Sequence, residues 1–83
     1  EIIVQYHPQS EKVAERFFDE YLKTRASLQT NPQRFQEVFL FVRRAFIAHF
    51  PYNVYYVVSE ATLEVEIIAV FHQKRDERLL RQR

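Results

Sequence analysis

The sequence predicts an α+β fold in which a helix or a helical hairpin packs on one face of a small antiparallel β-sheet. Residues 11–29 have apolar side chains at the three- and four-residue steps of an amphipathic helix. Two runs rich in β-branched and aromatic residues, 52–58 and 63–71, are separated by the spacing of a β-hairpin. The chain has 83 residues, 47% of them hydrophobic, so we expect one domain over residues 1–83 with a small packed core.

The predicted helix begins after Ser10, whose side chain can cap it, and has Glu11 in its first turn. It ends before Asn31 and Pro32, because helices rarely continue through a proline. The polar side chains between its apolar positions are expected to face solvent. The apolar positions are Val13, Ala14, Phe17, Phe18, Tyr21, Leu22 and Leu28.

The segments around this helix are less regular. Residues 33–37 can form a short helical turn, and the apolar and aromatic run 38–50 is expected to be a strand. Pro51 lacks a backbone donor and ends that strand. By pattern alone, the residues before the turn at His7 and Pro8 fit a strand and the end of a helix equally well.

The hairpin pattern also predicts which side chains share a face. With a two- or four-residue loop, Val58 lies opposite Leu63, and side chains alternate from there. The face expected to be core carries Tyr52, Val54, Tyr56, Val58, Leu63, Val65, Ile67, Ala69 and Phe71. The face expected to be half open carries Asn53, Tyr55, Val57, Glu64, Glu66, Ile68, Val70 and His72. A loop of three or five residues would exchange the faces of one strand.

Composition argues against several classes of function. Without cysteine or glycine, the chain has no thiolate nucleophile and no glycine-rich phosphate loop. Its histidines, His7, His49 and His72, lack the close spacing of metal ligands, so we predict no metal and no cofactor. No apolar run is long enough to span a bilayer, and we expect a cytoplasmic protein that does not act at a membrane.

A basic cluster follows the last predicted strand, although the formal net charge is only +1. His72, Lys74 and Arg75 lie there, and the hairpin is expected to bring them near Asn53 and Tyr55. A histidine with two cations can support RNA cleavage through general acid–base catalysis and phosphate stabilisation. The alternative is a histidine at a strand end followed by a solvated basic tail.

Two further arginines, Arg43 and Arg44, are consecutive in a predicted strand. Because neighbouring side chains in a strand point to opposite faces, at most one of them can join the cluster around His72.

Four segments in order along the chain carry a resemblance to a known family. They are NPQRF (31–35), VRRAF (42–46), HFPYNVYY (49–56) and IAVFHQKRD (68–76). Together they resemble the RelE/ParE toxin superfamily, whose members are also described as plasmid stabilisation proteins. The resemblance covers residues 6–76 and implies an N-terminal strand, two antiparallel helices and three antiparallel strands.

In this alignment, residues 1–6 correspond to the end of the family's first helix. The resemblance therefore favours a helix there and implies an N-terminally truncated domain without the family's first strand. A missing strand would expose a sheet edge, through which two copies could pair as a homodimer.

The superfamily divides by activity, and this sequence is similar to its ParE-like branch. ParE-like members poison DNA gyrase, whereas RelE-like members cut mRNA on the ribosome. In the nuclease branch an arginine commonly occupies the position of Asn53, and only His72 matches the nuclease pattern here. Asparagine provides neither the charge nor the forked donors that stabilise a phosphorane-like transition state.

The resemblance thus implies a toxin that binds and inhibits a target such as DNA gyrase and is neutralised by a cognate antitoxin. The alternatives are a ribosome-dependent endoribonuclease and an inactive relative that only binds an antitoxin. The candidate catalytic residues of a nuclease are His72, Arg75, Lys74 and Arg44. The candidate contacts to an antitoxin or target are Arg43, Asn53, Tyr55, Ile68, Val70, His72, Lys74 and Arg75. An antitoxin segment is expected to cover the half-polar sheet face or the helix groove.

Overall fold

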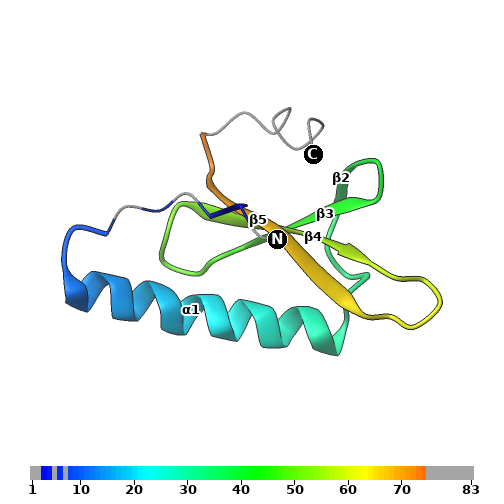
Figure 1. Ribbon diagram of the computed structural model, residues 1–83, viewed down its shortest axis with the longest axis horizontal. Helices are drawn as coiled ribbons and strands as arrows, with labels where there is room; N and C mark the ends of the chain where they lie inside the picture. The colour runs from blue at the N-terminus through cyan, green and yellow to red at the C-terminus, as the bar shows by residue number, and fades with distance from the viewer. Residues whose placement is uncertain (1–2, 5, 7, 75–83) are drawn as a thin grey trace.

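A helix lies along one face of a five-stranded sheet in the computed structural model (Figure 1). The structure describes residues 3–4, 6 and 8–74. Its elements are β1 (Ile3–Val4), α1 (Glu11–Thr30), β2 (Glu37–Phe39), β3 (Val42–Phe46), β4 (Tyr52–Val58) and β5 (Val65–His72). The strand order is β1-β5-β4-β3-β2, with β1 parallel to β5 and the other neighbours antiparallel. The predicted α+β class is confirmed, with one helix in the described part of the chain.

Local chemistry fixes both ends of α1. Ser10 has an extended backbone, and its Oγ accepts a hydrogen bond from the Val13 N–H at 3.2 Å, as a helix cap does. At the other end the Asn31 N–H donates to Ser27 O, and Pro32 follows. The predicted bounds of the helix are therefore confirmed to within one residue.

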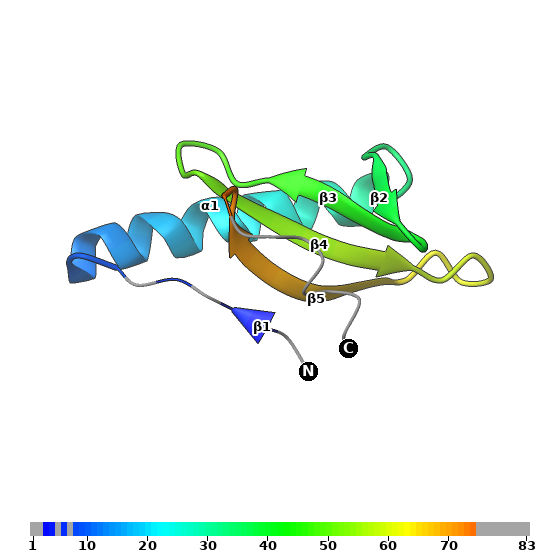
Figure 2. The same cartoon turned by 90° about the horizontal axis from the view of Figure 1, so that it is seen from above.

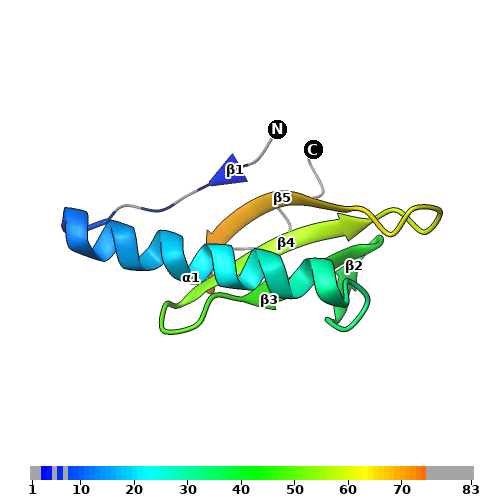
Figure 3. The same ribbon diagram turned by 90° about the horizontal axis from the view of Figure 1, so that it is seen from below.

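The core lies between the sheet and α1, which crosses in front of the strands in Figure 3. Phe17 and Leu28 are the buried apolar residues of α1, and they pack in one cluster with residues of β3, β4 and β5. The buried members of these strands are Ala45, Val54, Tyr56, Ile67 and Val70. Thr24, between the two helix contacts, places its Oγ1 3.2 Å from Phe46 O and 3.1 Å from Glu20 O. This hydroxyl ties the middle of α1 to the end of β3.

The register of β4 and β5 corrects the predicted faces. Val58 pairs with Val65, so the loop has six residues, 59–64, instead of two or four. Farther along, Tyr56 pairs with Ile67 but Tyr55 pairs with Ala69, which leaves Ile68 as the extra residue of a β-bulge.

The bulge reverses the alternation in the second half of β5. Val65 and Ile67 face α1, as predicted. Ala69 and Phe71 were expected on this face but belong to the cluster on the opposite face, while Val70 packs in the core under α1. The face prediction was therefore correct before Ile68 and wrong after it.

The first strand of the sheet is a second correction. Ile3 and Val4 form β1, which pairs in parallel with Ala69 and Val70 of β5. The helix that the family alignment favours at residues 1–6 is thus wrong for Ile3 and Val4. A strand, β1, therefore occupies part of the β5 edge, which removes the reason for expecting that edge to be open at Ala69 and Val70.

The segment between α1 and β4 differs from the single strand predicted over residues 38–50. A turn at Leu40 and Phe41 divides it into β2 and β3, and residues 33–35 form a turn and a bend instead of a helical turn. Both turn residues have positive φ, 39° and 68°. A two-residue hairpin turn with φ above zero at both positions normally uses Asn or Gly, and this chain has no glycine. The turn therefore holds two bulky residues in a strained conformation.

We expect the double substitution Leu40→Asn/Phe41→Gly to stabilise the protein by roughly 1 kcal/mol, because it relieves left-handed strain at two exposed positions. Urea denaturation measures the change. As a matched control, Ala61→Gly introduces glycine into another exposed turn whose residue does not have positive φ, and it should cost about 0.5–1 kcal/mol. Equal destabilisation by both changes would contradict strain at Leu40 and Phe41.

Candidate functional site

The residues proposed from the sequence as one cluster lie on two faces of the sheet. The ring of His72 contacts that of Tyr52 on the α1 side, with centroids 5.1 Å apart. Its Nδ1 accepts a hydrogen bond from the Lys74 N–H at 3.1 Å, which orders the turn after β5. Along β4, the side chains of Asn53 and Tyr55 lie on the opposite face from that of Tyr52, so they face away from α1. The hairpin therefore brings the backbone of His72 near that of Asn53 in the sheet, but it does not place their side chains together.

The face away from α1 is closed where it was expected to be half open. Tyr55 and Ile68 are buried in a second apolar cluster with Ala69 and Phe71. Asn53 is only 4% exposed, and its Nδ2 donates to Tyr55 Oη at 3.2 Å. Its Oδ1 is buried without a hydrogen-bond partner among the described residues. The expectation of a half-polar, partly solvated surface is thus wrong for these residues.

Arg43 and Arg44 do point to different surroundings, as predicted. Arg43 Nη1 donates to Gln33 O at 3.1 Å and to Phe35 O at 2.5 Å. A carboxylate oxygen of Glu37 lies 3.9 Å from Arg43 Nη2. Arg43 therefore fastens the segment between α1 and β2, a role that sequence reasoning missed.

Arg44 occupies the other side of β3. It pairs with Tyr55, and its guanidinium lies 5.8 Å from the centre of the Phe46 ring. This position shares the face of Asn53 and not that of His72.

Tyr56 anchors the same segment as Arg43, from inside the core. Its Oη donates to Pro32 O at 2.7 Å, and the side chain is fully buried. Burial raises the pKa of the Tyr56 phenol, although the charges of Arg43 and Arg34 act in the opposite direction. Burial also raises the pKa of Tyr52, with a smaller contribution from Tyr6.

The candidates for catalysis therefore do not converge in the described part of the chain. His72 lies on the α1 side and Arg44 on the opposite side, while Lys74 is exposed after the end of β5. Arg75 lies outside the described residues. Within those residues, no group of three His, Cys, Asp or Glu side chains could hold a metal ion.

The structure also contains an apolar hollow beside α1. It has a volume of about 220 Å³ and is lined by Phe17, Phe18, Tyr21 and Val70. Phe18 stacks on Tyr21 with ring centroids 6.3 Å apart, yet 57% of it remains exposed. Leu22, one turn after Phe18, is also exposed. We call this surface of Phe17, Phe18, Tyr21, Leu22 and Val70 the helix groove.

Of these residues, only Val70 was among the predicted binding positions. The sequence did contain a signal for the groove residues of α1. The apolar stripe of residues 11–29 is wider than the part of it that is buried in the core, which consists of Phe17 and Leu28. An apolar stripe wider than its covered part leaves side chains for another surface to bury.

The arrangement can be compared with known proteins. Residues 1–77 match the family model described as the ParE toxin of the type II toxin–antitoxin system, parDE. Neither the curated proteins nor the solved structures gave a significant match. None of the helices in the described part of the chain has the length and apolar character needed to cross a membrane.

Raised tyrosine pKa values predict how stability depends on alkaline pH. The buried phenol of Tyr56 releases its proton less readily in the folded state than in the unfolded state, where its pKa is about 10. Its contribution to stability is thus complete below that pH and is lost as pH rises through the folded-state pKa. Urea unfolding between pH 8 and 11 should show this decline, and Tyr56→Phe should make it shallower. An unchanged slope in the variant would contradict the role of Tyr56.

Proposed function

The chain belongs to the ParE toxin family of type II toxin–antitoxin systems, and on that basis we propose that it inhibits DNA gyrase by binding. A cognate antitoxin, the partner that this family implies, neutralises it. The observation that carries the choice of binding over catalysis is the placement of Asn53. It is buried and hydrogen-bonded to Tyr55, on the face that His72 does not share.

A nuclease needs a proton-transferring group and a phosphate-stabilising cation within reach of the same atoms. His72 and Arg44 are separated by the sheet. Arg43, the other cation of β3, already donates to two carbonyl oxygens. Inhibition by binding makes no such demand on these side chains.

The helix groove is the surface that best fits an antitoxin segment. It is lined almost entirely by apolar atoms, and Phe18 and Leu22 on its rim are exposed in the isolated chain. An amphipathic segment lays its apolar side chains into such a groove, and burial of exposed aromatic rings supplies much of the binding free energy. The alternative antitoxin surface, the sheet face with Tyr55 and Ile68, is already buried.

Purified protein in excess should abolish DNA supercoiling by gyrase and leave mRNA intact in a translating extract. His72→Ala should retain full inhibition of gyrase, because the proposed activity needs no general acid or base. Normal supercoiling at excess protein would refute the gyrase proposal. Cleaved messages that disappear with His72→Ala would instead establish the nuclease activity.

Phe18→Ser should weaken antitoxin binding by about ten-fold or more, because it removes an exposed ring from the centre of the groove rim. Its cost to folding should be small for the same reason. Phe46→Ser removes an equally exposed ring from the opposite face of the sheet and serves as the matched control. Calorimetric titration with the antitoxin measures both, and a loss confined to Phe46→Ser would place the antitoxin on the other face.

A further inference from the structure

Two hairpin turns lie at the same end of the sheet, away from the N-terminus of α1 (Figures 1 and 2). The β2–β3 turn exposes Leu40 and Phe41, which are 75% and 70% accessible. The β4–β5 loop exposes Leu63, which is 54% accessible. The pairings of Arg43 with Tyr56 and of Val58 with Val65 place both turns at this end.

All three exposed side chains stand on left-handed backbone, with φ of 39°, 68° and 60° for Leu40, Phe41 and Leu63. Bulky residues are unfavourable in that region, where Asn or Gly carries little penalty. Since these side chains are exposed, core packing does not compensate for the strain. Large apolar side chains that are both strained and exposed are typical of contact sites.

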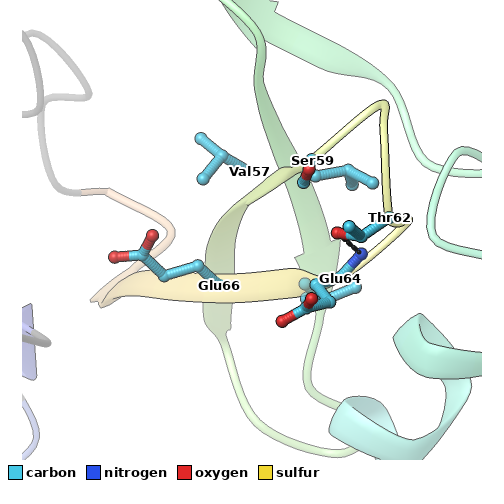
Figure 4. Close-up of a pocket in the computed structure, with 7 residues that line it drawn as sticks. Val57, Ser59, Thr62, Glu64 and Glu66 are labelled. Atoms are coloured by element: carbon cyan, nitrogen blue, oxygen red, sulfur yellow. Dashed lines mark hydrogen bonds between the residues drawn. The ribbon is translucent and has the colours of Figure 1, made fainter.

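A hollow of about 730 Å³ lies beside Leu63 in the β4–β5 hairpin (Figure 4). Val57, which lines it, packs against the cluster on the face away from α1, where its cross-strand partner Glu66 also lies. The carboxylates of the hollow come from Glu64 and Glu66. Two backbone hydrogen bonds order the loop, from the Ser59 N–H to Glu64 O at 2.9 Å and from the Leu63 N–H to Ser59 O at 2.7 Å. The Glu64 N–H also donates to the side-chain oxygen of Thr62 at 3.4 Å. The hollow is therefore shaped before any partner arrives.

The charged side chains that line the hollow are carboxylates. Glu60, Glu64 and Glu66 are exposed, and none of them forms an ion pair with another described residue. The neighbouring arginine, Arg43, is engaged by two carbonyl oxygens and by Glu37. These carboxylates would repel a nucleic-acid backbone, an anionic lipid surface and the same end of a second copy.

We propose that this hairpin end, formed by Leu40, Phe41, Leu63 and the hollow, binds a basic protein surface and is the contact through which the chain engages its target. A lysine or arginine side chain of the partner lays its aliphatic stem on Val57 and its charged head against the carboxylate of Glu66. Leu40, Phe41 and Leu63 bury themselves against apolar groups beside that cation.

The choice of gyrase as the target rests on the proposed function. Proteins that handle DNA carry lysine and arginine surfaces to bind phosphates, so gyrase is a target of matching charge. The hairpin end is formed by the turns of the sheet and the helix groove by the middle of α1. The target contact is therefore separate from the proposed antitoxin contact.

The hollow itself is tested with a simple cation, independently of gyrase. L-argininamide added to the labelled protein should shift the amide resonances of Val57, Val58, Glu64 and Glu66 in heteronuclear NMR spectra. Glu64→Gln/Glu66→Gln should abolish these shifts, while Glu15→Gln/Asp19→Asn, which removes the same charge from the exposed side of α1, should retain them. Shifts that survive Glu64→Gln/Glu66→Gln, or that never appear at the hollow, would overturn the site.

The contact with the target is tested with a variant that should fold more stably than the natural chain. Leu40→Asn/Phe41→Gly relieves turn strain but removes two apolar contacts, so potency against gyrase should fall by about ten-fold while antitoxin affinity stays unchanged. Undiminished potency would overturn the target contact. If the natural chain fails to inhibit gyrase, the proposed target is wrong, and the argininamide titration still decides whether the hollow binds a cation.

Discussion

The β-bulge at Ile68 determines which side chains of β5 meet α1. Without it, Ala69 and Phe71 would continue on the face of Ile67, and Val70 would point away from the helix. The bulge instead supplies Val70 to the floor of the helix groove and Phe71 to the cluster with Tyr55. It also sends His72 to the side of Tyr52, away from Arg44. One inserted residue thus sets the core, the groove and the separation of the candidate catalytic groups.

The single described helix packs against one face of the sheet. Leu28 and Phe17 supply the apolar burial, and Thr24 adds a polar contact to the backbone of Phe46. The irregular segment after the helix is fastened separately by Tyr56 and Arg43, which donate hydrogen bonds to carbonyl oxygens within it. Because Tyr56 and Arg43 form hydrogen bonds with backbone carbonyl groups, they hold in place the segment that leads into β2.

Features set by local chemistry could be predicted from the sequence, and features set by distant contacts could not. Ser10 and Pro32 bound the helix through their own hydrogen-bonding properties, and both ends were predicted correctly. The turn at Leu40 and Phe41 escaped prediction because neither residue favours left-handed backbone. Alternation holds over residues 63–67 and then gives way to a continuous apolar run, which is the visible trace of the bulge, but this pattern cannot say which residue is extra.

The candidate site, too, could be predicted from the sequence only in part. The family was recognised from ordered motifs, and the match over residues 1–77 confirms it. Individual contact residues depend on which face a side chain occupies, so the register error beyond Ile68 carried over to Val70 and His72. Phe18 and Leu22 were assigned to the helix correctly, but their exposure depends on how much of the sheet one helix covers.

The pairing of β1 with β5 has a consequence for the order of folding. The contacts between β2 and β3, β3 and β4, and β4 and β5 join segments that follow one another, whereas Ile3 and Ala69 come from nearly opposite ends of the described chain. Closing so long a loop for two paired residues costs much chain entropy and returns little contact. We therefore expect the antiparallel meander and α1 to assemble first and β1 to dock last, and the backbone amides of β1 to exchange soonest in the native protein.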